Sequence, residues 1–453
     1  MHDLMEPTVG ELENSTLATL LSGERFWPDE PNSVEESGLP GPFVESLLCK
    51  LLLANGKMSG RHLSKRIALP HKALDLVFTK LRTHQLITHA GAAPLNDYVY
   101  QLTESGKREA QIAYEMCRYL GPAPVPLKDY VVSVEAQAIS DEAIRPDELE
   151  AAFGQISVTP QLLNLLGPAI NSASGMFLHG APGNGKSTLA QRITACFGQE
   201  IWIPHALIED DSIVKVLDPA YHQEIDLDRR TDLRSSNWDR RWVRIKRPTV
   251  MVGGELRMEG LEIRHDAVRN LSEAPLQMKS NCGCLLIDDF GRQQISPVEL
   301  LNRWIVPLEC RHDFLTLATG KRIVVPFEQL VIFSTNLEPS HLVDEAFLRR
   351  IPYKIEVENP DEDEFHELFQ LQADQLGCDY NSGAVDDLLE KHYRPLERGL
   401  RRCHPRDIMK QVNNYCKYHG LPLKMSIENF DQVAGSFFTN CLKADSCCDN
   451  PQK

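Results

Sequence analysis

The stretch that most constrains this chain is an apolar run followed at once by a glycine-rich loop. Residues 175–179 are mostly apolar, residues 180–187 read Gly-Ala-Pro-Gly-Asn-Gly-Lys-Ser, and a helical pattern follows. This is the spacing G-x-x-x-x-G-K-[ST], the P-loop pattern, in the strand–loop–helix context that it requires. The sequence therefore predicts a buried strand, a tight loop and a helix N-terminus that together form an anion site.

The chemistry of this loop predicts a phosphate-binding site. Glycines let the backbone turn several N–H groups inward, and the helix that opens at Lys186 adds the positive end of its dipole. Lys186 supplies a cation near the terminal phosphate, and the Ser187 hydroxyl is placed to bind Mg²⁺. The residues predicted to contact the nucleotide in this loop are Gly180, Ala181, Pro182, Gly183, Asn184, Gly185, Lys186, Ser187 and Thr188.

Two later apolar runs end in polar side chains. Residues 284–287 lead into Asp288 and Asp289, and residues 330–335 lead into Asn336. In a doubly wound sheet, ligands gather at the carboxyl ends of the strands, so these side chains are expected beside the loop. We predict that Asp288 binds Mg²⁺, that Asp289 polarises the attacking water and that Asn336 hydrogen-bonds water and phosphate.

Alternating strand and helix patterns over residues 151–358 predict an α/β fold with a doubly wound parallel sheet. A long insertion, residues 208–281, separates the second and third expected strands and is larger than such a fold needs. A helix is expected within it at 265–278 and a hairpin at 247–259. The five expected strands are residues 175–179, 200–207, 284–288, 330–334 and 353–357.

Length and composition indicate several globular domains. The chain has 453 residues, of which 42% are hydrophobic and 25% charged. It shows no apolar run long enough to cross a membrane and no signal-peptide core, and its cysteines are scattered, so we expect a cytoplasmic protein without membrane insertion. The predicted division is an acidic arm at 1–41, a separate unit at 42–120, a Pro-rich linker at 121–150, an α/β nucleotide-binding domain at 151–358, a helical lid at 359–442 and a tail at 443–453.

Residues 42–120 form a basic unit in an acidic chain. Three helical patterns and two strand patterns follow one another in an order that resembles a winged helix-turn-helix. The unit carries eleven Lys and Arg against six Asp and Glu, whereas the whole chain has a net charge of −16. Local positive charge is expected of a face that binds DNA or RNA. Such a fold also serves as a protein-docking module, so both functions stay open.

Taken in order, the motifs resemble those of the AAA+ ATPase family over residues 151–440. The P-loop, the Asp-Asp strand and the Asn336 strand are followed by Ala-Phe-Leu-Arg-Arg at 346–350 and His-Pro-Arg-Asp at 404–407. The resemblance implies that Asn336 is the sensor 1 residue and Arg406 the sensor 2 residue. It also implies that Arg349 and Arg350 occupy the arginine-finger position, which reaches the nucleotide of a neighbouring subunit, and that a hairpin at 318–327 precedes sensor 1.

The resemblance implies ATP and Mg²⁺ as cofactors and a homo-oligomeric ring, in the family usually a hexamer. We expect an ATPase that remodels a protein or protein–nucleic-acid partner; the alternative is an ATP-dependent nucleic-acid-binding switch such as an initiator, loader or regulator. With its basic unit the chain also resembles uncharacterised bacterial members described as chaperone-like. Two departures matter: Asp289 stands where most members have Glu, which suggests slow turnover, and the candidate pore loops at 252–254 and 258–260 lack an aromatic residue.

Overall fold

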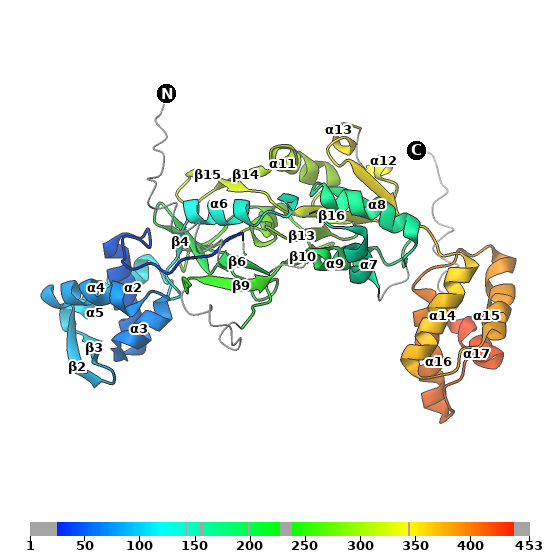
Figure 1. Ribbon diagram of the computed structural model, residues 1–453, viewed down its shortest axis with the longest axis horizontal. Helices are drawn as coiled ribbons and strands as arrows, with labels where there is room; N and C mark the ends of the chain where they lie inside the picture. Colours follow the sequence, from blue (N-terminus) through cyan, green and yellow to red (C-terminus); the bar gives the residue numbers. More distant parts are fainter. Residues whose placement is uncertain are drawn as a thin grey trace.

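The computed structural model consists of three parts that lie in a row (Figure 1): an N-terminal helical unit, a central α/β body and a C-terminal helical bundle. It describes residues 25–141, 143–154, 158–197, 200–226, 238–342 and 345–438. Most of the predicted acidic arm and the whole predicted tail lie outside these residues.

A five-stranded sheet forms the centre of the body. Its strand order is β10-β13-β16-β5-β17, and every neighbouring pair is parallel. This confirms the predicted α/β fold with a doubly wound parallel sheet. The strands are β5 (Met176–His179), β10 (Thr249–Val252), β13 (Cys284–Ile287), β16 (Leu330–Thr335) and β17 (Tyr353–Glu356).

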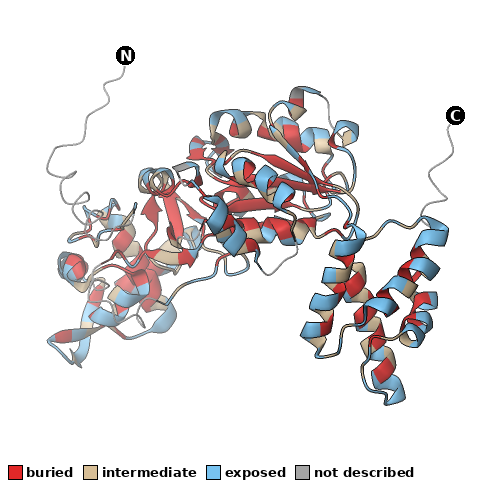
Figure 2. Ribbon diagram, turned by 45° about the vertical axis from the view of Figure 1, so that its right-hand side comes forward, coloured by how far each residue is buried: buried red, intermediate tan, exposed pale blue. Residues whose placement is uncertain are grey.

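Helices cover both faces of this sheet because side chains along each strand alternate between two apolar cores. In β13, Cys284 and Leu286 join one core, while Leu285 and Ile287 join the other. The three inner strands, β5, β13 and β16, are entirely buried, whereas the edge strands β10 and β17 are partly exposed (Figure 2). The first face is covered by α7 (Pro146–Phe153), α8 (Pro160–Asn171) and α9 (Lys186–Cys196), and the second by α11 (Pro297–Cys310).

The second strand of the sheet is not the predicted one. Residues 200–204 form β6 (Glu200–Pro204), which pairs with β9 (Trp242–Lys246) outside the sheet. The neighbour of β13 is β10, whose Val250 is fully buried, so the expected hairpin at 247–259 is also wrong. Both runs are short and apolar, and only their partners distant in sequence decide which of them joins the sheet.

The insertion contains a second, smaller sheet instead of the helix expected at 265–278. Asn270 has φ of +47°, which turns the chain back on itself, so that this segment holds two short strands and one helical turn. The strand order is β11-β12-β8-β7-β4. The new elements are β4 (Val125–Pro126), β7 (Ala206–Glu209), β8 (Ser212–Lys215), β11 (Arg264–Asp266), β12 (Leu271–Glu273) and α10 (Leu276–Lys279).

The segment predicted as a Pro-rich linker carries regular structure. Its start forms β4, which pairs with β7, and α6 (Leu127–Ala136) follows directly. Tyr130 of α6 is 1% exposed, and its hydroxyl donates to the carbonyl oxygen of Met278. Pro126 stands just before α6, where a missing N–H costs the helix no hydrogen bond.

The N-terminal unit has the expected order of three helices and a hairpin. Its apolar core extends into the body, because Ile208 of β7 and Ile213 of β8 belong to the same cluster. The unit is therefore packed on the body rather than tethered to it. Its elements are α2 (Gly41–Asn55), β1 (Met58–Ser59), α3 (Gly60–Ile67), α4 (His71–Thr83), β2 (Ile87–Ala93), β3 (Asp97–Leu102) and α5 (Glu104–Met116).

A buried arginine ties this unit to the insertion. Arg241 is 4% exposed and pairs with Asp239, which is 2% exposed. Its Nη1 donates to the carbonyl oxygens of Ser37 at 2.8 Å and Pro124 at 3.3 Å. A buried charge needs such partners, since an unpaired one costs several kcal/mol. One side chain thus joins the chain before α2, the chain before β4 and the insertion.

The C-terminal bundle has an apolar core of its own. Its helices bury one side each and expose the other (Figure 2). Asp361 begins the bundle as an N-cap that accepts from the backbone N–H of Glu364 at 2.8 Å. The α-helices are α14 (Glu362–Leu376), α15 (Ser382–Leu388), α16 (His404–His419) and α17 (Ile427–Phe438).

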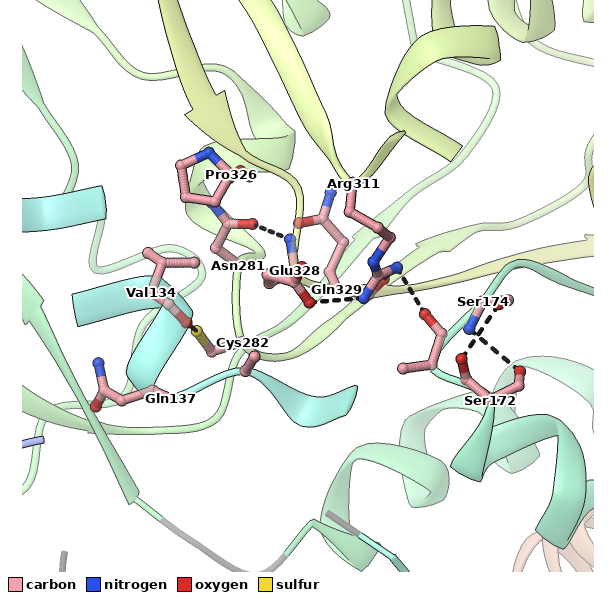
Figure 3. A network of polar contacts seen from close by, with 12 residues as sticks. Val134, Gln137, Ser172, Ser174, Asn281, Cys282, Arg311, Pro326, Glu328 and Gln329 are labelled. Atoms are coloured by element: carbon pink, nitrogen blue, oxygen red, sulfur yellow. Dashed lines mark hydrogen bonds and ion pairs between the residues drawn. The ribbon is translucent and has the colours of Figure 1, made fainter. Parts of the chain in front are cut away.

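A polar network fastens the amino ends of three sheet strands (Figure 3). The Arg311 guanidinium pairs with Glu328, just before β16, and donates to the carbonyl oxygen of Ala173, just before β5. The backbone N–H of Glu328 donates to Oδ1 of Asn281, just before β13. Strands β13 and β16 pair in parallel from Cys284 opposite Leu330 to Ile287 opposite Phe333, so their other ends, which lead into Asp288 and Asn336, lie at one edge of the sheet.

Candidate functional site

The glycines of the P-loop adopt backbone angles that favour this residue. Gly180, Gly183 and Gly185 have φ values of +133°, +85° and +84°. A Cβ on Gly180 would lie 2.6 Å from the carbonyl oxygen of Val357, which directly follows the neighbouring strand β17. Helix α9 then begins at Lys186, so its N-terminus faces the loop as the sequence predicts.

Ser187 and Asp288 meet at the carboxyl edge of the sheet. The Ser187 hydroxyl donates to Oδ2 of Asp288 at 2.7 Å, across 101 residues of sequence. A hydroxyl and a carboxylate side by side are the hard oxygen donors that Mg²⁺ prefers, so the two residues fit the predicted metal site. Bound there, the ion would neutralise charge on the phosphate oxygens.

Lys186, Asn336 and Asp289 form a continuous chain of contacts. Nζ of Lys186 donates to Oδ1 of Asn336 at 2.7 Å and to the carbonyl oxygens of Gly180 and Ala181 at 2.9 and 3.0 Å. The Asn336 amide donates in turn to Oδ1 of Asp289 at 3.3 Å. Burial lowers the pKa of Lys186, while the nearby Asp288 and Asp289 oppose that shift. The structure thus brings together the residues predicted for phosphate and water.

Asp289 is exposed at the end of β13 in an unusual backbone conformation. Its φ is +50°, in the left-handed region that Asp tolerates better than most residues. This turn directs Phe290 back into the core, where it is 1% exposed. Gln293, which the sequence analysis did not single out, holds the turn by donating to the carbonyl oxygen of Asp288 at 2.8 Å. The sequence gives no signal for this role of Gln293, because its partner is a backbone carbonyl oxygen, which every residue has.

The two predicted finger residues differ in their surroundings. They follow the short helix α13 (Glu345–Leu348), which lies beyond β16 and α12 (Pro339–Leu342). Arg350 is ion-paired with Glu309 of α11 at 2.7 Å, and its side chain is 19% exposed. Arg349 is exposed. Only Arg349 therefore presents its charged side chain to solvent, as a residue that reaches a neighbour must.

The lid and the P-loop together enclose a cavity of about 300 Å³. Leu368 and Leu371 of α14 and Arg406 of α16 are among the residues that line it. Val158 also lines the cavity, whereas Phe153 is buried in the core of the body. The cavity has the apolar wall and polar rim that a nucleoside needs.

Two further predicted features have a place in the structure. The hairpin ahead of sensor 1 is longer than predicted, because β14 (His312–Thr316) and β15 (Arg322–Pro326) pair antiparallel before β16. The predicted range 318–327 covers only its turn and its second strand. The candidate pore segment at 252–254 follows β10, and the backbone N–H of Asp288 donates to the carbonyl oxygen of Val252 at 2.8 Å. That segment therefore lies at the same sheet edge as the phosphate site, without an aromatic residue.

Comparisons with known proteins add a family match for the lid. Residues 361–436 match a family described as a domain of unknown function, DUF8689. No curated protein matches the chain. In the part of the chain that the structure describes, no helix is both long and apolar enough to cross a membrane.

Several solved structures show a distant likeness. NtrX from Brucella abortus has 14% identity and a TM-score of 0.38 over 67% of this chain and 58% of that chain. The structure of NtrX in complex with ATP has 16% sequence identity with this chain and a TM-score of 0.36, over 62% of this chain and 58% of that chain. RuvB from Thermotoga maritima, described as a Holliday junction branch migration motor, has 14% identity and a TM-score of 0.35, over 65% and 70%. This chain spans less than two thirds of the length of NtrX.

Proposed function

We propose that the chain is an ATPase of the AAA+ type that binds ATP with Mg²⁺. The observation that carries the proposal is the meeting of Ser187 with Asp288 and of Lys186 with Asn336 at one sheet edge. Hydrolysis needs a positioned water, and Asp289 is the exposed carboxylate beside this site. Its side chain is one methylene shorter than Glu, so we expect slow, switch-like turnover.

Each residue has a role in this proposal. The loop N–H groups and the α9 terminus hold the phosphates, and Lys186 moves from its present carbonyl contacts to the terminal phosphate. Asp289 orients water for attack, while Asn336, already in contact with both Lys186 and Asp289, holds water and phosphate in line. Arg406 approaches the phosphates from the lid.

We further propose a ring, in the family usually of six subunits, that remodels a protein or protein–nucleic-acid partner in the cytoplasm. Support comes from Arg349, whose exposure suits an arginine that acts on the neighbour's nucleotide. Repeating one head-to-tail contact closes such a ring.

The proposal is tested by replacing Lys186. We expect Lys186→Ala to abolish binding of a fluorescent ATP analogue, because it removes the cation at the phosphate without opening the core. Lys215→Ala, an exposed lysine on β8, is the matched control and is expected to bind normally. Equal affinity of both variants, with both folded by circular dichroism, would rule out the phosphate site.

A second candidate is nucleic-acid binding through the N-terminal unit. Lys72 and Arg82 of α4 are exposed, and a polar groove of about 610 Å³ lies between α4 and β2. Other basic residues are engaged: Lys50 is 4% exposed, and Lys80 pairs with Glu45 at 2.6 Å. Leu76, which is 79% exposed on the same helix, favours a protein partner instead.

Salt-dependent DNA binding by the full chain separates the two candidates. If α4 binds DNA, Lys72→Glu with Arg82→Glu is expected to abolish retention at low salt and to leave ATP binding intact. Lys107→Glu with Arg108→Glu, two exposed residues on α5 of the same unit, makes the same change in net charge and is the control. Failure of the unaltered chain to bind DNA at low salt would favour protein docking.

A further inference from the structure

One residue of the P-loop turns away from the solvent that surrounds its neighbours. Asn184 is 1% exposed, although it lies between two loop glycines. Its Nδ2 donates to the carbonyl oxygen of Val357 at 3.2 Å and to Oδ1 of Asn359 at 2.9 Å. Its Oδ1 accepts from the backbone N–H of Arg402 at 3.4 Å. Both amide N–H groups of this side chain, and one acceptor position of its oxygen, are therefore directed toward other segments.

These segments lie where the lid approaches the P-loop. Val357 and Asn359 belong to the connection between β17 and α14, which joins the body to the lid. Arg402 and Cys403 immediately precede α16, the helix that carries Arg406. Asn184 thus lies at the point where the incoming chain and the lid's third α-helix both meet the P-loop.

Neighbouring contacts reinforce this junction. The backbone N–H of Cys403 donates to the carbonyl oxygen of Gly183 at 2.9 Å. Arg401 donates to Oδ1 of Asn359, the same oxygen that accepts from Asn184. A Cβ on Gly183 would lie 2.5 Å from Sγ of Cys403, so the loop and the start of α16 are in direct contact.

We propose that Asn184 is a positioning residue that couples occupancy of the P-loop to the placement of the lid. The inference rests on the proposed function, since it needs a nucleotide in the P-loop. When phosphates draw the loop N–H groups inward, Asn184 moves with the loop and carries the 357–359 connection and the N-terminus of α16 with it. The start of α16 and Arg406 are thereby brought over the nucleotide, where a helix N-terminus stabilises anionic oxygens.

The direction of the hydrogen bond between the two asparagines allows a matched test. In Asn184→Asp, the donating amide is replaced by an oxygen that faces two acceptors, Val357 O and Asn359 Oδ1. In Asn359→Asp, the accepting oxygen remains and the added charge faces Arg401. The two variants make the same chemical change on opposite sides of one hydrogen bond, and only the first breaks it.

The experiment measures hydrogen exchange of the α16 amides at residues 406–409 in the full chain, with and without a saturating non-hydrolysable ATP analogue. We expect the unaltered chain and Asn359→Asp to gain protection on binding, and Asn184→Asp to gain none. The affinity of Asn184→Asp for the analogue is expected to fall about tenfold, since more than one hydrogen bond is lost. Equal protection in both variants would overturn the coupling.

Two further variants keep the outcome clear. Asn184→Ala removes the hydrogen bonds without adding charge, and it must also reduce the gain in protection even if Asn184→Asp does not fold. A full gain in Asn184→Ala would overturn the proposal. Lys186→Ala separates this inference from the proposed function: if Lys186→Ala loses the analogue while Asn184→Ala responds normally, the site stands and the coupling fails.

Discussion

The sharpest prediction concerns the two consecutive arginines after α13. Arg350 pairs with Glu309 of its own subunit at 2.7 Å, and Glu309 is 45% exposed. A pair open to solvent on one side contributes at most about 1 kcal/mol to stability, so we expect Arg350→Ala mainly to lower the melting temperature by a few degrees. Arg349 is exposed, so Arg349→Ala is expected to leave the melting temperature unchanged.

The expected effect on turnover is the reverse. A finger supplied in trans contributes about 10³–10⁵ in rate, which is about 4–7 kcal/mol of activation free energy. Arg349→Ala should therefore bind the ATP analogue normally but release phosphate at least a thousandfold more slowly. The assay is phosphate release at saturating ATP, read beside analogue binding and thermal melting. Mixing Arg349→Ala with Lys186→Ala should restore part of the rate, because an intact P-loop then meets an intact finger. Normal turnover in Arg349→Ala, with the defect in Arg350→Ala, would refute the reasoning.

Three other predictions concern the water site, the lid and the core. Asp289→Asn is expected to retain ATP but to lose at least about 10²-fold in hydrolysis, since an amide cannot orient water as a carboxylate does; an unchanged rate of phosphate release would exclude this role. Burial, together with the charge of Arg401, lowers the pKa of His404 in the folded chain to about 4. In the unfolded chain this pKa is about 6.5, so between about pH 4 and 6.5 the unfolded chain binds more protons than the folded chain does. The contribution of His404 to stability is thus complete above about pH 6.5 and declines as the pH falls toward about 4. His404→Gln should make the melting temperature depend less on pH over this range, and an unchanged pH dependence would contradict the assignment to His404. Gln329 is 0% exposed, and neither of its side-chain polar atoms has a partner among the described residues. Gln329→Met should therefore raise the free energy of unfolding by about 1–2 kcal/mol, and a lower free energy of unfolding in a denaturant titration would contradict this.

The parts of the site that lie in short motifs could be predicted from the sequence. Helix α9 begins at Lys186 as expected, and the ends of β13 and β16 present Asp288 and Asn336 beside it. These predictions succeeded because the loop is contiguous and because parallel strands end at one edge. The side chains of these residues already have the charge and the hydrogen-bonding groups that a phosphate site needs, so the fold has only to bring the two strand ends together.

Features that depend on distant partners could not be predicted. Residues 200–204 and β10 are both short apolar runs, and only pairing with β13 distinguishes them. The side chain of Asn184 belongs to the P-loop pattern, but its partners lie 175 and 218 residues away. Periodicity and local spacing carry no information about such contacts.

The buried pair of Arg241 and Asp239 has a mechanical consequence. Because it fixes the stretch before α2 to the insertion, the N-terminal unit cannot move independently of the body. It is expected to turn together with the body, and the β2–β3 hairpin lies at the end of the unit that is far from the body (Figure 1). A rotation of the body would therefore displace this hairpin further than it displaces the residues of the unit that contact the body.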